Sequence, residues 1–395
     1  MAVAYHFQKT GDFVIEDYSR AKAWSSFFPG IAGLYGIPLW VFYVNRGQCI
    51  ASAGIRTKDE AMMEYLPANK AYQLTPTQGF RTFIKVRRGK KQIFYEPFSP
   101  SYAAGAAKGI SNSLTIRPYE LELTEVNASL GIKTQVIYFC LPGEPYAALV
   151  RCLTVTNLSS QPQDFTILDG LAACVPYGVN NFFLKEMSRT IEAWMTVENI
   201  DGGIPLYKLS TDPRDTAQVA FVKGAHFYMG FEEDKTCRSN KVIADPQAIF
   251  GQETDLIRPL KFEESSAFAY PARQAATNKM ACAFSFLRWH LKKAQSSSHM
   301  SLLGHVFDAG DVKKYSLEKI DAAFIRAKRQ ENRRIVEDIA DRIFTASGRP
   351  VLDQYARQTY LDNVLRGGLP VTLGLDGKKK TVYVFSRKHG DLERD

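Results

Sequence analysis

The chain contains 395 residues, of which 45% are hydrophobic and 23% are charged, and this composition excludes an intrinsically disordered or collagen-like protein. The length allows two or three domains, and the 12% of aromatic residues suits β-strands and surfaces that stack on sugars or bases. The formal net charge of +9 is unevenly placed, because residues 313–395 hold 18 Lys and Arg against 12 Asp and Glu, a net charge of +6. This basic bias fits anionic ligands such as phosphate or nucleic acid, but a solvent-exposed charged helix is the simpler interpretation.

An uncharged stretch is the first feature in chain order. Residues 1–13 contain no apolar run after a basic start, so no signal peptide is expected. Residues 24–45 carry no charge, and by length alone they approach a membrane-spanning helix. The dense prolines and glycines of segment 29–38 break this stretch, which favours a turn followed by a buried strand at 39–44.

A succession of short segments rich in Val, Ile, Thr, Tyr and Phe follows, and turn residues separate most of them. The predicted strands are 39–44, 79–86, 92–98, 114–126, 134–139, 147–156, 164–171, 219–223, 226–231, 281–291 and 302–307. Many short strands without long intervening helices predict a large, mainly antiparallel β-sandwich of two sheets.

The pattern becomes helical near Lys313. Residues 317–345 are rich in Ala, Arg, Glu and Ile with helical spacing, and the Gly-Arg-Pro sequence at 348–350 ends this run. A second helical run is predicted at 353–365, and a strand at 381–386.

The cysteines give no metal or disulfide signature. None of the six forms a CxxC pair and their spacings are wide, which is typical of reduced, buried thiols in a cytoplasmic protein. The six histidines show no pair at i,i+4 spacing, and the Walker A, GxGxxG, GxSxG and HExxH motifs are missing. We therefore expect neither a metal site nor a resident cofactor.

Three clusters of residues are richer in polar side chains than a β-sandwich without a binding or catalytic role requires. Residues 45–48 follow the first buried strand, although a hairpin turn explains them. Lys58 and Asp59 with Glu64 fit a short helix whose acidic and basic groups are surface partners. Residues 386–395 are almost wholly charged or polar, and a disordered tail is the alternative interpretation.

Several stretches of the chain resemble the family 94 glycoside phosphorylases, in particular the branch that acts on β-1,2-linked glucans. The resemblance lies in WSSFFPGIAGLYGIPLWVFYVNRGQ (24–48), GIRTKDEAMMEYLPANKAYQ (54–73), GFRTF (79–83), LDGLAACVPYGV (168–179), KEMSRTIEAWMTV (185–197), SLLGH (301–305), LDNVLRGGLPV (361–371) and SRKHGDLERD (386–395). It therefore extends over nearly the whole chain.

The resemblance implies an N-terminal β-sandwich, a helical linker, an (α/α)6 catalytic barrel and a C-terminal β-domain. On this map residues 1–312 correspond to the sandwich, 313–352 to the linker and 353–395 to a truncated start of the barrel. The expected fold class is mainly β: a large two-sheet antiparallel β-sandwich, or supersandwich, followed by a helical linker and the start of the barrel.

The start of a barrel would lack its packing partners in this chain. The apolar side chains of Leu365, Leu369, Val371 and Val382 are therefore expected to be exposed or loosely packed.

The chemistry implied by the resemblance is inverting phosphorolysis of β-1,2-glucooligosaccharides to glucose 1-phosphate. An Asp of the barrel donates a proton to the glycosidic oxygen, and phosphate attacks the anomeric carbon from the opposite face. Both groups are expected beyond residue 395, so no catalytic residue is assigned in this chain. Asp59, Glu64, Asp391 and Glu393 are not put in their place. Inorganic phosphate is then a co-substrate, and no cofactor is expected.

Four residues near the C-terminus are the best candidates for glucan contact, because dense charged planar groups suit bidentate hydrogen bonds to sugar hydroxyls. These residues are Arg387, His389, Asp391 and Arg394, with Arg46 as a weaker candidate that a turn also explains.

The partners expected are β-1,2-linked glucooligosaccharides, together with the missing catalytic portion or a second copy of the chain. Nucleic acid and membranes are not expected. Two alternatives stay open: a stand-alone carbohydrate-binding or oligomerisation module, and a part of a β-1,2-glucan transglycosylase.

Overall fold

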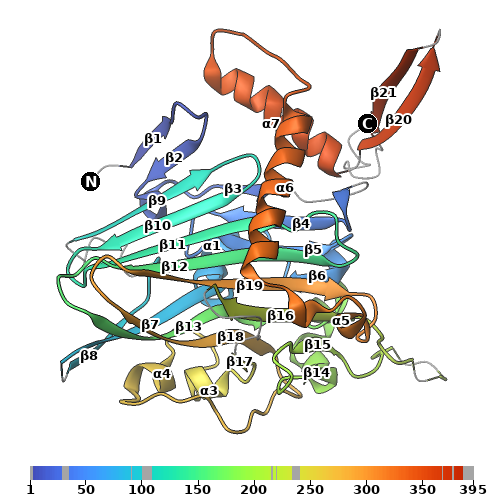
Figure 1. The fold of residues 1–395 in the computed structure, drawn as a ribbon. Coiled ribbons are helices and arrows are strands. Elements are labelled where there is room, and N and C mark those ends of the chain that lie inside the picture. The colour runs from blue at the N-terminus through green and yellow to red at the C-terminus, as the bar shows by residue number, and fades with distance from the viewer. Residues whose placement is uncertain are drawn as a thin grey trace.

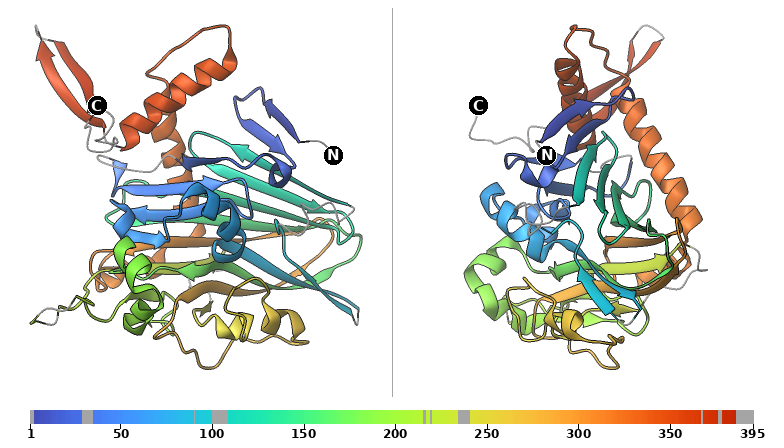
Figure 2. Two further views of the ribbon diagram at one scale, coloured as in Figure 1. Left: turned by 180° about the vertical axis from the view of Figure 1, so that it is seen from behind. Right: turned by 90° about the vertical axis from the view of Figure 1, so that its left-hand side faces the viewer.

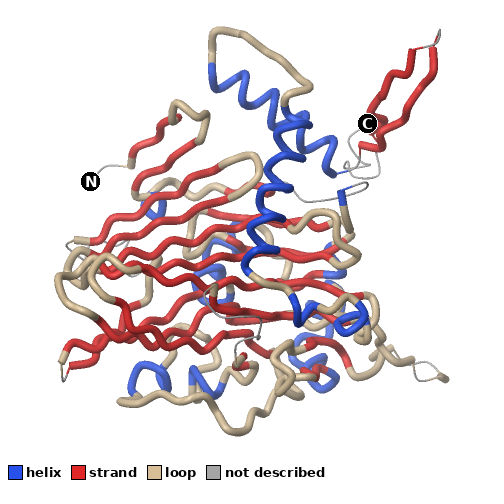
Figure 3. The backbone as a smooth tube through the Cα atoms, in the orientation of Figure 1, coloured by secondary structure: helices blue, strands red, loops and turns tan. Residues whose placement is uncertain are grey.

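Three antiparallel sheets build the body of the protein, and two long helices follow them (Figures 1 and 3). The computed structural model describes residues 3–28, 35–89, 91–99, 109–214, 217–218, 220–233, 241–366, 368–375 and 378–385. The mainly β fold class predicted from the sequence is thus confirmed.

The largest sheet has ten strands, of which the first six follow chain order and the last four run in reverse chain order. From edge to edge it contains β1 (Ala4–Phe7), β2 (Phe13–Glu16), β9 (Ile110–Ile116), β10 (Leu121–Asn127), β11 (Ile132–Cys140), β12 (Ala147–Asn157), β19 (Ser296–Val306), β16 (Ala225–Glu232), β15 (Leu206–Leu209) and β14 (Met195–Glu198). The late strand β19 therefore lies between β12 and β16, in the middle of the sheet.

Two smaller sheets face the large one. The five-stranded sheet has the order β17 (Val242–Ile243), β18 (Ala281–Leu291), β13 (Gln163–Cys174), β7 (Phe80–Arg88) and β8 (Lys91–Tyr95). The four-stranded sheet has the order β3 (Ser25–Phe28), β4 (Leu39–Val44), β5 (Ile50–Ile55) and β6 (Ala61–Met63). A hairpin of β20 (Gly368–Leu375) and β21 (Lys378–Phe385) stands apart from them.

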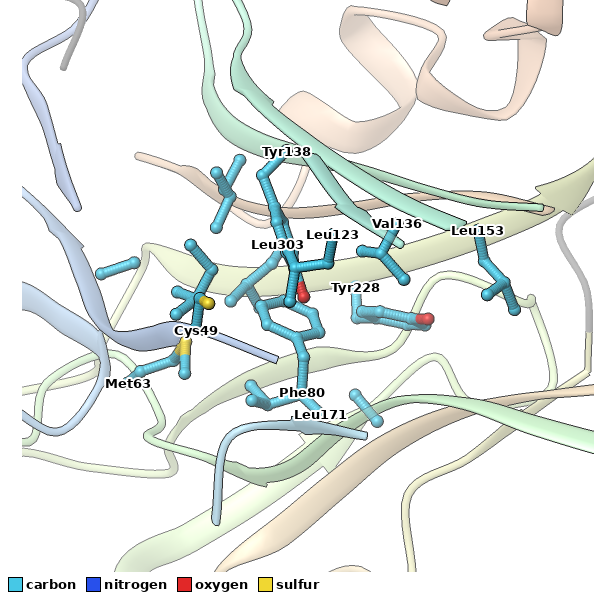
Figure 4. Close-up of a cluster of buried hydrophobic side chains, with 14 of the residues drawn as sticks. Cys49, Met63, Phe80, Leu123, Val136, Tyr138, Leu153, Leu171, Tyr228 and Leu303 are labelled. Atoms are coloured by element: carbon cyan, nitrogen blue, oxygen red, sulfur yellow. The ribbon is translucent and has the colours of Figure 1, made fainter. Parts of the chain in front are cut away.

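One hydrophobic core joins the three sheets. Leu123 and Tyr138 come from the large sheet, Phe80 and Leu171 from the five-stranded sheet, and Met63 from the four-stranded sheet, and all five are buried in the same cluster (Figure 4). The burial along β10 alternates residue by residue, as the period-2 pattern of the sequence predicts.

Short helices connect the strands, and two long ones follow them. The α-helices are α1 (Ala68–Gln78), α3 (Gln247–Phe250), α4 (Leu260–Glu264), α5 (Asp311–Lys314), α6 (Ala322–Ala340) and α7 (Pro350–Arg366). The other helical turns are η1 (Tyr18–Arg20), η3 (Lys58–Glu60), η4 (Phe183–Met187), η5 (Ser188–Trp194) and η6 (Leu317–Lys319). None of the described helices is long and apolar enough to cross a membrane.

Helix α6 lies across the outer face of the ten-stranded sheet (Figure 2, right). Its amide at Phe324 donates to the Asp321 side chain at 2.8 Å, which caps the first turn, and Ile325 packs with Phe231 and Leu302 of the sheet. Pro350 begins α7, a position where its missing N–H costs nothing.

The expectation that Leu365 is exposed is wrong. Leu365 is buried with Leu361 of α7 against Val336 and Ile339 of α6, so the helix pair forms its own small core. The side chains of the β20–β21 hairpin lie outside the described residues, and so do the expectations made for them.

Two strand predictions also differ from the structure. The run 114–126 is a hairpin of β9 and β10, because Pro118 offers no N–H to a sheet and the chain turns there. Residues 220–224 have no regular structure, although a strand was predicted at 219–223.

A buried ionic network ties the large sheet to the five-stranded one. Arg151 of β12 donates from Nη1 to Asp169 Oδ2 of β13 at 2.5 Å, and Thr82 Oγ1 of β7 donates to Asp169 Oδ1 at 2.7 Å. His299 Nδ1 of β19 lies 3.0 Å from the same carboxylate. Burial alone would raise the pKa of Asp169, but the Arg151 charge and these hydrogen bonds outweigh it and hold that pKa below its usual value.

A second buried carboxyl makes stability depend on pH. Burial raises the pKa of Glu125 on β10 to about 7, against a usual value of 4.5, although Tyr95 Oη donates to it at 2.5 Å. Between these values the folded chain keeps a proton that the unfolded chain releases, so stability falls as pH rises from 4.5 to about 7. Above pH 7 the carboxylate is buried as an anion.

Replacing Glu125 by glutamine removes this titration. The parent chain loses stability as pH rises, whereas E125Q does not. The unfolding free energy of E125Q minus that of the parent chain should therefore increase by about 2–3 kcal/mol from pH 5 to pH 8. Urea unfolding at both pH values measures the gain, with the exposed Glu16→Gln of β2 as the control. If E125Q and the parent chain differed in unfolding free energy by the same amount at both pH values, the raised pKa of Glu125 would be contradicted.

Candidate functional site

A cleft of about 470 Å³ lies beside the four-stranded sheet, a volume typical of ligand pockets. Six parts of the chain form its wall: the β5–β6 region, α1, the end of β13, η5, α3 with its flanking loops, and the loop that precedes β18. The lining residues are Ala51, Met63, Glu64, Leu66, Leu74, Thr75, Gln78, Gly79, Ala173, Val175, Arg189, Glu192, Pro246, Gln247, Gly251, Gln252, Glu253, Thr254, Leu256, Asn278, Lys279 and Met280.

Local structure positions the polar groups of this wall. Glu64 follows the last residue of β6, and Thr75 and Gln78 lie three residues apart on one side of α1. Gly79 ends α1 where a Cβ would approach the Thr75 carbonyl oxygen to 2.6 Å, so only glycine lets the chain turn into β7 there. Asn278 adopts a left-handed backbone with φ of 56°, a conformation that asparagine tolerates, and its N–H donates to Met195 O at 2.9 Å.

The cations of the wall already have partners. Arg189 Nη1 lies 3.2 Å from Glu192 Oε1, and Lys279 Nζ lies 3.3 Å from Asp245 Oδ1. Burial raises the pKa of Glu64, and the Lys185 charge opposes this shift. Glu64 makes no hydrogen bond or ion pair to any described residue.

Gln247, Gln252, Glu253 and Thr254 add further polar groups to the wall, and the remaining side chains are apolar. Met63, Leu74, Val175 and Met280 contribute aliphatic or thioether surface, and no Phe, Tyr or Trp is among the described residues that line the cleft. Among the residues that the structure describes, no group of three or more His, Cys, Asp or Glu side chains is placed to hold a metal. The arrangement therefore suits binding through hydrogen bonds over an apolar floor.

The structure tests the sequence candidates unevenly. Arg387, His389, Asp391 and Arg394 lie outside the described residues. Arg46 is half-buried in the turn after β4, where it donates to Asn45 O at 2.7 Å and Ala21 O at 3.1 Å. These contacts fit the turn role, and a ligand role for Arg46 stays a prediction.

The polar cluster at 58–64 separates in space. Asp59 Oδ1 accepts the Asn181 N–H at 3.1 Å, and the ion pair on this segment joins Arg56 to Glu60. Glu64 instead lines the cleft. Sequence reasoning did not single out Gln78 or Asn278, because 200 residues separate them and no local pattern marks either one.

Comparison with known proteins gives distant structural likenesses. No protein-family model matches the chain. No curated protein matches it either. Among solved structures, a polysaccharide lyase aligns with a TM-score of 0.38 and 10% identity over 72% of this chain and 34% of its own. A human-microbiome protein assigned as a kojibiose phosphorylase aligns with a TM-score of 0.36 and 8% identity, over 89% of this chain and 35% of its own.

The chain thus spans about a third of the length of these structures. Both TM-scores lie below 0.5, so neither likeness assigns an activity or a substrate to this chain.

Proposed function

We propose that the chain is the N-terminal, non-catalytic portion of a β-1,2-glucan phosphorylase-like enzyme that works in the cytoplasm. The observation that carries the proposal is the order of the elements. A large antiparallel sandwich is followed by one helix along its outer face and by a second helix packed on the first, the order that the resemblance to family 94 implies.

The positions of the resembling stretches support this proposal. GFRTF (79–83) and LDGLAACVPYGV (168–179) include the paired segments of β7 and β13, where Thr82 lies opposite Asp169. SLLGH (301–305) lies in β19, two residues after His299 of the same buried network. These three stretches therefore overlap strands that contribute to the buried network between the two sheets.

In such an enzyme the sandwich would support the chemistry without performing it. Inverting phosphorolysis needs an acid beside the leaving oxygen and an anion site on the other face of the sugar, both fixed in a cleft that excludes water. We assign neither group to a described residue.

An activity assay tests the proposal. The 395-residue chain alone is expected to release no glucose 1-phosphate from sophorotriose and phosphate. The natural protein that contains this chain and continues beyond Asp395 is expected to release it, with strict dependence on phosphate. Redistribution of sophorotriose into longer and shorter glucans without phosphate would favour the transglycosylase alternative, and turnover by the 395-residue chain itself would contradict the proposal.

A carbohydrate-binding module remains the second candidate, and the cleft beside α1 is the observation that favours it. This candidate predicts glucan binding by the 395-residue chain and no activity in any longer natural protein.

A further inference from the structure

A second groove, of about 420 Å³, lies on the five-stranded sheet. Strands β8, β7, β13 and β18 form its floor, and the loop after α4 forms one wall. Side chains alternate between the two faces of a strand, and Val86, Phe165 and Leu287 of these strands are buried in the core between the sheets. The groove therefore opens on the opposite, outer face of the sheet.

The register of the strands gathers three cations in this groove. Thr166 of β13 pairs with Lys85 of β7 on one side and with Arg288 of β18 on the other. Neighbouring strands lie about 5 Å apart, so the side chains of Lys85 and Arg288 begin about 10 Å apart across the groove. Arg87 follows Lys85 by two residues and therefore points to the same face. All four side chains line the groove.

The three cations differ in how much of their hydrogen-bonding capacity is used. The Arg288 Nη2 group donates to Phe268 O at 3.1 Å, and its guanidinium lies 5.2 Å from the centre of the Phe286 ring. These contacts orient Arg288 and leave other N–H groups of its guanidinium for a ligand. The side chain of Arg87 is exposed and makes no ion pair or hydrogen bond to any described residue. The buried Lys85 ammonium already donates to a backbone carbonyl, so it contributes mainly its charge.

Neutral donors accompany these charges. The hydroxyls of Thr166 and Ser266 and the amide of Gln92 line the groove, and none of these side chains has a hydrogen-bond partner in the part of the chain that the structure describes. Asp164 is the one carboxylate in the described lining, and its Oδ1 lies 2.6 Å from His290 Nδ1. Three cations against one carboxylate leave the described lining with a net charge of +2 when the histidine is neutral.

We propose that this groove binds the phosphate group of a small phosphorylated molecule or of free phosphate. A phosphate monoester carries a charge of about −1.5 to −2 at pH 7 and three terminal oxygens. The guanidinium groups of Arg87 and Arg288 suit paired hydrogen bonds to two of these oxygens, and the hydroxyls of the groove suit the third. A carboxylate fits less well, because it has two oxygens and a single charge.

This site is separate from the cleft beside α1. It does not rest on the proposed function, whose own phosphate-binding group is expected beyond residue 395.

Calorimetric titration of the 395-residue chain at low ionic strength tests the proposal, with inorganic phosphate and glucose 1-phosphate as probes and acetate as the comparison. Arg87→Ala is expected to weaken binding of the phosphate probes about tenfold, because it removes a charged donor of paired hydrogen bonds. Arg87→Lys keeps the charge without the planar fork, so about a threefold loss should remain. Arg273→Ala, an exposed arginine outside the groove, should leave binding unchanged.

The carboxylate of the groove provides a test of opposite sign. Asp164→Asn removes a negative charge beside the ligand, so phosphate binding should strengthen about threefold. Asp201→Asn makes the same change of charge at an exposed position outside the groove, and it should have no effect. Equal strengthening by the two variants would show that only the net charge of the chain matters and would contradict the proposal.

The other outcomes are equally decisive. Phosphate binding that is weakened by R87A and not matched by acetate supports the site, and the tighter of the two phosphate probes distinguishes free phosphate from a phosphate ester. Acetate binding as tight as that of phosphate overturns the class of ligand. Absent phosphate binding, or binding that R87A and R273A weaken equally, overturns the site. The phosphorolysis assay decides the proposed function independently of each of these results.

Discussion

Replacing Asp169 by alanine should lower the unfolding free energy of the chain by about 3–5 kcal/mol. The carboxylate is fully buried, and it neutralises Arg151, which is 1% exposed. Without it a guanidinium charge remains in the core with no counter-charge. The loss is large, because the whole free energy of unfolding of a typical domain is only about 5–15 kcal/mol. Urea unfolding followed by circular dichroism measures the loss.

The same strand provides a matched control. Asp164 of β13 forms an exposed pair with His290, so its replacement by alanine should cost about 1 kcal/mol or less. Replacing Arg151 and Asp169 together by methionine and leucine should cost less than D169A, because no unpaired charge stays behind. Equal losses for D169A and D164A would show that the buried pair is not what stabilises the sheets.

Gly170→Ala is the second change with a large expected effect, about 3 kcal/mol or more. A Cβ at this position of β13 would lie 1.9 Å from the carbonyl oxygen of Ala283 on β18. The two strands are paired directly there, so the clash can be removed only if the backbone shifts in the middle of a sheet.

Gly89→Ala is the control for this prediction. Gly89 has a positive φ of 59° but nothing within 4 Å of its Cβ position, so alanine should cost only the backbone strain of about 1 kcal/mol. Thermal unfolding compares the two variants. A G170A chain as stable as the G89A chain would mean that β13 and β18 are not packed as described.

The long strands in the middle of the sheets were predictable because their signals are local. The expected strand at 39–44 coincides with β4, since Pro38 and a polar turn bound a short apolar run. The break at Pro118, which divides one predicted run into β9 and β10, needed a proline to be weighted more heavily. The short strands β1, β2, β3, β5, β6, β14, β15 and β17 were not predicted, and the strand predicted at 219–223 was wrong.

The helical segments on the surface of the sandwich were not predictable in the same way. Helix α1 contains Pro76 in its last turn, and α3 and α4 are too short to show a helical period. Contacts hold the short helices in place: Phe250 and Phe262 both pack on Phe83 of β7, with ring centroids 5.9 and 6.3 Å apart from it. A local pattern cannot contain that information.

The candidate cleft escaped sequence reasoning for the same physical reason. Glu64, Thr75 and Asn278 come from three separate elements, and only the pairing of β13 with both β7 and β18 brings them to one place. Leu365 shows the opposite error, because the resemblance pointed to an absent barrel as its only partner, whereas α6 provides one within the chain.

Because β19 lies inside the ten-stranded sheet, this sheet cannot be completed until β19 has been synthesised. Ser296 leaves the ribosome about 140 residues after Asn157, the end of β12, a delay on the order of 10 s at ordinary rates of translation. Until then β12 and β16 each keep one open edge, and open edges invite pairing with other chains. The consecutive strands β18 and β19 then enter the two facing sheets, β18 beside β13 and β19 between β12 and β16, so the sandwich folds late and through contacts distant in sequence. Chaperone capture of the nascent chain during this interval would therefore govern how much of it reaches the folded state.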